Sequence, residues 1–197
     1  MNISLATKKD ATQIAIIRKR EINQGFLSQL GVKFLSKLYK STMVSPNAFT
    51  IVAKDNDKVI GFISGCTNVA KFYHDFFKKY FFQVFFILLP KMFKLSILKK
   101  IFETLKYPQQ KEEKKLPGAE LLTIAILKEY HGQGIAQKMF EKFVKEMKKR
   151  EIKQFKVIVG ESLMRAIRFY EKIGFKFHSS ISVHKHKPSS VYIYNTK

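Results

Sequence analysis

The chain of 197 residues contains a single cysteine, Cys66, which excludes an internal disulfide and offers no cysteine cluster for a metal. A chain without disulfides suits a reducing compartment, so we expect a cytoplasmic protein. Met1 to Lys9 also lacks the apolar stretch and cleavage site of a secretory signal. Because Cys66 has apolar neighbours, we interpret it as a small buried side chain on a strand rather than a nucleophile.

Long apolar runs are absent as well. A helix that spans a bilayer needs about 20 apolar residues. The apolar run from Tyr80 to Leu89 is about half that length, and Lys78 and Lys79 precede it. We therefore expect no transmembrane segment.

Acidic residues and arginine are scarce. Lysine and arginine total 37 against 15 aspartates and glutamates, which gives a net charge of +22 and a pI of about 10.0. Such a charge points to nucleic acid, anionic lipid or a phosphorylated ligand. Proteins that read nucleic acid use arginine and cluster their charge with stacking aromatics. Here lysines spread along the whole chain, which argues against nucleic acid and suggests that part of the charge is compositional. The arginines are Arg18, Arg20, Arg150, Arg165 and Arg168.

A short glycine motif, residues 131–136, lies between an apolar run, Leu121 to Leu127, and an amphipathic helix pattern from Ala136 to Arg150. This order predicts a strand, a glycine turn and a helix. Glycines at such a junction permit a tight turn and close approach to a ligand, and the first helical amides then point at an anion, usually a phosphate.

A second motif follows about thirty residues later, in the segment 164–175: a helix pattern ended by Gly174 and followed by a strand. Together the two motifs resemble the GCN5-related N-acetyltransferase (GNAT) family. Gly134 and Ala136 occupy the small positions of its Arg/Gln-x-x-Gly-x-Gly/Ala loop. The second motif has the matching residues Ala166, Tyr170, Lys172, Gly174 and Phe175. The chain departs from the family at His131, where Arg or Gln is usual, and at Leu163, where Asn is usual.

The resemblance implies a binding site for acetyl-CoA as co-substrate. Backbone groups of Ile124 and Ile126, on the strand Glu120 to Ile126, would hold the pantetheine arm where that strand splays from its neighbour. An amide near Ile126 would polarise the acetyl carbonyl. The pyrophosphate would lie on the amides that begin the following helix, with Lys138 nearby. The cofactor-binding residues expected on this basis are Ile124, Ala125, Ile126, His131, Gly132, Gln133, Gly134, Ile135, Ala136 and Gln137. For His131 we weigh a phosphate donor against a surface turn residue and favour the latter.

Acyl transfer to an amine needs a proton acceptor for the ammonium and a proton donor for the departing thiolate. By its place in the family motif, Tyr170 is the expected acid, since a phenol can protonate a thiolate. Glu120 is the favoured base, directly or through water, with Glu161 as the alternative. No metal is expected.

The expected fold is a single α/β domain over residues 1–197, with a mixed, twisted sheet flanked by helices. Asn2 to Leu5 predicts a strand, and Thr7 with Asp10 predicts a capping-box start to a helix that ends near Arg20. Further patterns predict a helix at Lys33 to Met43, strands at 49–53 and 59–64 joined by the turn 55–57, and a strand at 155–159.

Residues 70–118 form a Phe- and Lys-rich segment without a counterpart in the family, placed between the third and fourth strands. We expect two helices, followed by a solvated linker over 108–117. Three interpretations stay open: an insertion packed on the sheet, a lid or homodimer surface near the acceptor, and an interfacial membrane helix.

These patterns predict an acetyl-CoA-dependent N-acetyltransferase that acts directly on a primary amine of a small molecule, an amino sugar or a protein. The alternative is a catalytically inactive module of the same fold that binds a membrane surface or a protein partner through residues 70–118.

Overall fold

The computed structural model describes residues 1–23, 26–92, 116–184 and 187–196. In this part of the chain, seven strands form one sheet in the order β1-β2-β3-β4-β5-β7-β6. Neighbouring strands are antiparallel except β4 and β5, which are parallel, so the sheet is mixed. The strands are β1 (Asn2–Leu5), β2 (Ala48–Asp55), β3 (Lys58–Cys66), β4 (Glu120–Ile126), β5 (Gln154–Gly160), β6 (Lys176–His184) and β7 (Lys187–Asn195).

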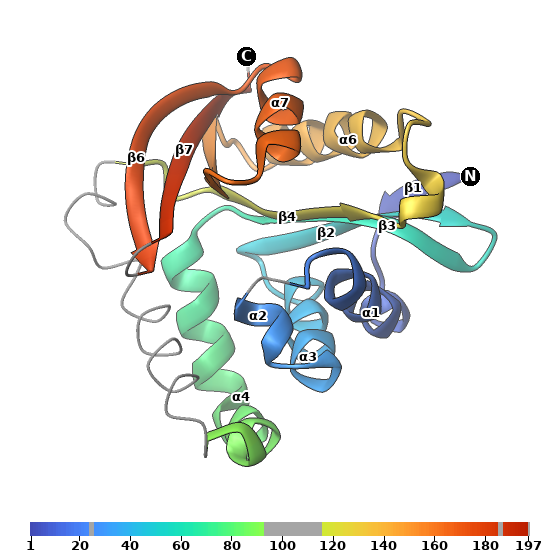
Figure 1. Cartoon of the computed structure of the whole chain (residues 1–197). Helices are drawn as coiled ribbons and strands as arrows, with labels where there is room; N and C mark the ends of the chain where they lie inside the picture. Colours follow the sequence, from blue (N-terminus) through green and yellow to red (C-terminus); the bar gives the residue numbers. More distant parts are fainter. Residues whose placement is uncertain (24–25, 93–115, 185–186, 197) are drawn as a thin grey trace.

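Helices cover both faces of this sheet (Figure 1). One face carries α1 (Ala11–Glu21), α2 (Phe26–Gln29), α3 (Val32–Thr42) and α4 (Val69–Met92), and the other carries α6 (Ile135–Lys149) and α7 (Met164–Lys172). Short 3-10 helices precede α1 (η1, Lys8–Asp10) and follow β4 (η4, Lys128–Tyr130). The predicted fold class, a mixed twisted sheet flanked by helices, is confirmed.

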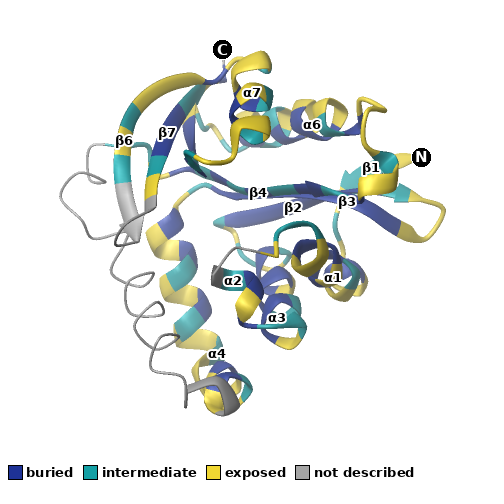
Figure 2. Cartoon of the chain, viewed as in Figure 1, coloured by how far each residue is buried: buried dark blue, intermediate teal, exposed yellow. Residues whose placement is uncertain are grey.

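Each face of the sheet has its own apolar core. Buried residues, dark blue in Figure 2, occupy much of the central strands. The core on the α1 face includes Ile14, Phe34 and Phe62, and that on the α6 face is built on Phe143 and Phe155. Alternate side chains of a strand point to opposite faces, so a central strand needs apolar residues on both. The nearly continuous apolar sequence of β4 meets this need.

The predicted capping box begins α1 after the short turn η1. The Thr7 backbone amide donates to the Asp10 carboxylate at 2.8 Å, and the Thr7 hydroxyl donates to it at 3.0 Å. Lys54 on β2 pairs with the same carboxylate, with 2.6 Å between Nζ and Oδ1. Burial alone would raise the pKa of Asp10, but the contacts with Lys54 and Thr7 lower it. One carboxylate therefore fixes the start of α1 and ties it to the sheet.

The predicted hairpin is also present, and Asn56 takes a positive φ of 50° at its turn. The C-terminal strand β7 was not predicted. It lies between β5 and β6: β6 directly precedes it and forms a hairpin with it, whereas β5 is distant in the sequence. Its sequence opens with Lys187 and Pro188 followed by two serines, a composition more typical of a loop.

In the segment 70–118, residues Val69–Met92 form α4, which is kinked at Tyr80 (φ −116°, ψ 16°). Before the kink, Phe72 and Phe76 are buried in the core of the α1 face. The first half of α4 thus packs in the core of the α1 face, where Phe76 meets Phe34 of α3 edge to face. Any further helix and most of the predicted linker over 108–117 lie outside the described residues, and the domain bounds stay a prediction.

Close packing between α6 and the sheet makes Gly65 a sensitive position. A Cβ there would lie 2.5 Å from the Phe143 ring and 2.8 Å from the Glu120 carbonyl oxygen. We therefore expect Gly65→Ala to lower the free energy of unfolding by about 1–3 kcal/mol, measured by urea denaturation. At Gly118 the nearest such atom is 3.9 Å away, so Gly118→Ala should change stability by less than about 0.5 kcal/mol. Equal midpoints for both variants would contradict this packing.

Candidate active site

The centre of the sheet contains an interrupted ladder. Among the described residues, β4 and β5 pair at one position, Glu120 with Lys156, and the Lys156 amide donates to the Ala119 carbonyl at 3.0 Å. Beyond this point the parallel strands share no backbone hydrogen bonds. We call the side of β4 that faces β5, over residues 121–126, the open edge of β4. An unpaired edge inside a sheet leaves backbone donors and acceptors for a ligand.

The register with β3 shows which groups lie on the open edge of β4. The Leu127 amide donates to the Ile60 carbonyl of β3 at 2.9 Å. Because amides alternate in direction along a strand, those of Ile126 and Ile124 point away from β3 and toward β5. In the described part of the chain no backbone acceptor pairs with either amide. These are the two residues whose backbone groups, by the family resemblance, would hold the pantetheine arm.

The glycine motif forms a tight loop between β4 and α6. Gly132 and Gly134 have positive φ values of 80° and 73°, and Gly134 is the N-cap of α6. The first amide of this helix with a backbone acceptor is that of Lys138, which donates to the Gly134 carbonyl at 3.2 Å. The amides from Gly132 to Gln137 have no hydrogen-bonding partner among the described residues. They form a cluster of donors at the positive end of a helix dipole.

His131 links this loop to the open edge of β4. Its Nε2 lies 2.9 Å from the Ile126 carbonyl oxygen, and its Nδ1 lies 3.2 Å from an Arg165 guanidinium nitrogen. The carbonyl can only accept and the guanidinium can only donate, so the ring is the neutral tautomer with its proton on Nε2. Both ring nitrogens are therefore engaged within the protein, which fits a structural loop residue better than a phosphate donor.

Arg165, in the first turn of α7, is a residue that the sequence analysis missed. Its contact with His131 brings a cation to the glycine loop from a segment more than thirty residues away. The only available signal was a basic residue inside the second motif. Its direction toward the loop depends on the tertiary fold.

Tyr170 lies on α7 in the core of the α6 face, 6% exposed, against the rings of Phe169 and Phe175. Ile124 and Ile126 border the same core. Burial raises the pKa of Tyr170, so its hydroxyl stays protonated at neutral pH. No hydrogen bond to this hydroxyl occurs within the described residues. A protonated phenol therefore lies on the α6 face of the sheet, in the core that Ile124 and Ile126 border.

Glu120 lies at the paired end of β4. Its carboxylate is 3.8 Å from Nζ of Lys156, and that ammonium donates to the Pro117 carbonyl at 2.8 Å. On the α1 face, burial and then the Glu120 charge raise the pKa of Tyr73, and the same two causes raise the pKa of Cys66. Cys66 is thus a buried thiol rather than a nucleophile, as its apolar neighbours suggested.

Glu161, the second candidate base, follows β5 directly. Its carboxylate accepts hydrogen bonds from the hydroxyls of Ser180 at 3.1 Å and Ser190 at 3.4 Å. Its backbone amide donates to the Pro188 carbonyl at 3.3 Å. Glu120 and Glu161 therefore lie at opposite ends of the β4–β5 pair: Glu120 where the strands pair, and Glu161 where they have separated.

A buried cation also faces β4. Arg18 on α1, 8% exposed, donates to the Tyr39 hydroxyl at 3.1 Å and to the Thr123 hydroxyl. Its Nε is shielded from solvent and has no hydrogen-bond partner, and no described carboxylate lies within ion-pair distance of it. Through Thr123, this guanidinium joins α1 and α3 to the middle of β4.

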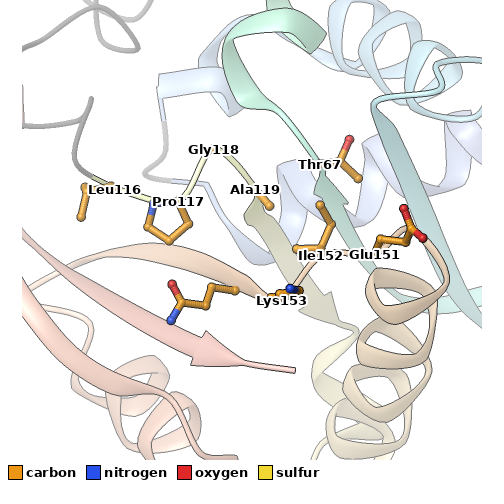
Figure 3. A pocket seen from close by; sticks show the side chains of 9 residues that line it. Thr67, Leu116, Pro117, Gly118, Ala119, Glu151, Ile152 and Lys153 are labelled. Carbon is orange, nitrogen blue, oxygen red and sulfur yellow. The ribbon is translucent and has the colours of Figure 1, made fainter. Parts of the chain in front are cut away.

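The described surface has a cavity of about 540 Å³, but it lies elsewhere (Figure 3). Its lining comes from Thr67, residues 116–119 and residues 151–154, where β4 and β5 begin. The glycine loop follows the opposite end of β4. The cavity is thus separate from the open edge and the helix N-terminus.

The comparisons with known proteins agree with this geometry. A model of the acetyltransferase (GNAT) family matches residues 20–175, well over half of the chain. The chain belongs to the GNAT acetyltransferase family. The match includes β4, the glycine loop, α6 and α7. No curated protein gives a significant match to the chain.

Solved structures of GNAT proteins share the fold over nearly their whole length. The PaiA N-acetyltransferase of Thermoplasma acidophilum, solved with coenzyme A, is 14% identical, with 99% of each chain covered and a TM-score of 0.64. An N-acetyltransferase of Staphylococcus aureus is 13% identical, covering 100% of this chain and 98% of its own, with a TM-score of 0.64. The ribosomal-protein-S18-alanine N-acetyltransferase of Escherichia coli is 14% identical, covering 100% and 94%, with a TM-score of 0.60. At these identities the likeness shows the fold.

The described helices of this GNAT protein include none that is both long and apolar enough to cross a bilayer.

Proposed function

We propose that this GNAT protein is an acetyl-CoA-dependent N-acetyltransferase that transfers the acetyl group directly to a primary amine. The observation that carries the proposal is the juxtaposition of two sets of backbone donors. The open edge of β4 presents the amides of Ile124 and Ile126, and the loop that follows presents those of Gly132 to Gln137. An extended arm ending in a diphosphate fits this order of groups.

The residues present suit acetyl-CoA, which supplies the acetyl group as an activated thioester. Ile124 and Ile126 would hold the pantetheine arm through their amides, and the helix N-terminus at Gly134 would hold the pyrophosphate. A Cβ at Gly132 or Gly134 meets no protein atom within 4 Å, so the loop surface is free of steric cover by the protein. His131 and Arg165 would position the loop against the end of β4 rather than bind phosphate through the imidazole.

Tyr170 would donate the proton that the leaving thiolate needs. Because burial raises the pKa of Tyr170, the hydroxyl holds its proton at neutral pH, which is the form that a general acid needs. Glu120 would accept the proton of the acceptor amine, directly or through water, with Glu161 as the alternative. Tyr170 belongs to the core of the α6 face, whereas Glu120 acts on Tyr73 of the α1 face. This separation supports an acceptor that approaches from the side opposite the cofactor.

The acceptor class comprises amines of small molecules, amino sugars and proteins. Similar folds serve different acceptors: one neighbour is described as acting on the alanine of ribosomal protein S18, and another is an aminoglycoside 6'-acetyltransferase. The net charge of +22 favours an acceptor with acidic or phosphate groups by long-range attraction.

Isothermal titration with acetyl-CoA, CoA and ATP tests the cofactor assignment, with Gly134→Val as the variant. The native chain should bind both CoA species and not ATP. Valine is strained at φ +73° and would place its branches over the loop amides, so we expect at least about a tenfold loss of affinity. Gly160→Ala, at a glycine without a positive φ and with 3.9 Å to its nearest neighbour, serves as the control. Failure of the native chain to bind acetyl-CoA would refute the proposal.

Tyr170→Phe isolates the proposed acid. We expect turnover to fall by roughly ten- to a thousandfold with acetyl-CoA affinity unchanged, because the ring is kept and only the hydroxyl is lost. Thiol release with an amine acceptor measures the rate, and titration measures the affinity. Tyr194→Phe, on β7 in the same aromatic cluster, should leave turnover unchanged. Equal rates for native protein and Tyr170→Phe would remove this tyrosine from the mechanism.

Glu120→Gln and Glu161→Gln distinguish the two candidate bases. We expect Glu120→Gln to lower turnover by roughly a hundredfold or more at neutral pH, because the amine then depends on solvent to lose its proton. The deficit should shrink as pH rises and more of the acceptor is already neutral. Glu161→Gln should stay within about threefold of the native rate. A pH–rate profile of each variant makes the comparison, and a larger loss in Glu161→Gln would reverse the assignment.

A further inference from the structure

The second half of α4 is apolar around almost its whole circumference, yet only one side is used by the core. Between Phe81 and Leu89, Gln83 is the one polar residue. Val84 and Leu88, one turn apart, are 4% and 6% exposed and pack in the core of the α1 face. A helix that is apolar on all sides is normally buried on all sides. This one is not.

The opposite side of the helix presents a contiguous strip of large apolar side chains to solvent. In Figure 2, exposed residues recur along α4. Phe82 is 74% exposed and Phe86 is 67% exposed. These side chains recur every three or four positions, so they share one side of the helix. Their rings contact one another: Phe81 stacks on Phe85 at 6.4 Å between centroids, and Phe85 meets Phe86 edge to face at 5.8 Å. The phenylalanine strip consists of Phe81, Phe82, Phe85, Phe86 and Leu89.

The surroundings of the phenylalanine strip are basic. Lys78 and Lys79 lie in the preceding turn, and α4 has four lysines in its sequence against one acidic residue, Asp75. The whole chain carries +22. A second copy of this chain is therefore a poor occupant, because symmetric pairing of the strips would bring like charges together. The positive charge and the apolar strip instead suit a lipid bilayer, which has an apolar interior beneath anionic headgroups.

We propose that the phenylalanine strip is a peripheral membrane-binding surface. Its aromatic and leucine side chains insert into the headgroup boundary of an anionic phospholipid bilayer, while Lys78 and Lys79 contact the lipid phosphates. In Figure 1, α4 extends away from the sheet toward the lower margin of the view. A helix with an apolar side and adjacent lysines lies in the plane of the interface.

Vesicle co-sedimentation of the full chain tests this surface. Vesicles of equal parts phosphatidylcholine and phosphatidylglycerol should retain the native protein, and vesicles of phosphatidylcholine alone should retain less. Phe82→Ser with Phe86→Ser should weaken vesicle binding by at least about tenfold, because two phenyl groups that would be buried in the bilayer are removed. The matched control is Phe177→Ser on β6, which removes a phenyl group that is 58% exposed and lies far from α4 in the sequence. This variant should bind the vesicles as the native protein does.

Charge variants separate insertion from nonspecific attraction. Lys78→Glu with Lys79→Glu should weaken binding by about tenfold or more, whereas the same change in net charge at the exposed Lys142 and Lys145 of α6 should have a smaller effect. Binding of the native protein should weaken with salt but persist, since the phenyl groups do not depend on charge.

Three outcomes would overturn the proposal. The first is no sedimentation with anionic vesicles at low salt. The second is binding that salt abolishes and that Phe82→Ser with Phe86→Ser leaves unchanged, which would indicate adsorption of a basic protein. The third is a dimer in vesicle-free solution that the same double variant dissociates. Thermal unfolding of each variant verifies that these exposed substitutions leave the fold intact.

Discussion

The unpaired edge of β4 is the constraint on which the rest of the site depends. A backbone amide inside a sheet costs free energy when it lacks an acceptor, so strands normally pair along their whole length. Here β4 and β5 pair at Glu120 and Lys156 and then share no backbone bonds. The protein itself satisfies one group on this edge, since His131 bonds the Ile126 carbonyl. The amides of Ile124 and Ile126 have no backbone acceptor among the described residues, and they are the donors that we propose for the co-substrate.

The ion pair at the start of this edge serves geometry more than stability. Lys156 is 3% exposed and Glu120 is 12% exposed, at a separation of 3.8 Å. Desolvation offsets most of the attraction in such a buried pair, so its net stabilisation is small. Its position is the informative property: it holds the two strands together at the point where they diverge. The same carboxylate is the base that we propose, so under this proposal one residue both closes the ladder and serves the acceptor amine.

The sequence was most informative where the determinants are local. The apolar run of β4, the glycines at 132 and 134 and the amphipathic pattern of α6 all lie within thirty residues, and each element formed where it was predicted. The capping box at Thr7 and Asp10 is local in the same way. The acetyl-CoA site on β4 and the roles of Tyr170 and Glu120 remain predictions, because they concern ligands and protons rather than backbone structure.

The features that escaped prediction are non-local. The strand β7 pairs with the distant β5, and its Ser190 donates to the Glu161 carboxylate, which no pattern near Lys187 could indicate. Similarly, Arg165 acts through a contact with His131 that exists only once α7 packs above the loop. Contacts between distant segments depend on the register of the whole sheet, and a single sequence contains no direct record of that register.

The helix α4 has two halves that differ in their contacts with the rest of the protein. Its first half contributes Phe72 and Phe76 to the core of the α1 face and Tyr73 to the surroundings of Glu120, the proposed base. The kink at Tyr80 then changes the direction of the chain, and the second half exposes aromatic side chains that a core would normally bury. If exposure served no purpose, a single polar substitution at Phe82 or Phe86 would relieve it without loss of core packing, since neither side chain is buried. The four exposed phenylalanines, which follow Lys78 and Lys79, therefore contribute little to the core, and the bilayer contact that we propose would give them an apolar environment.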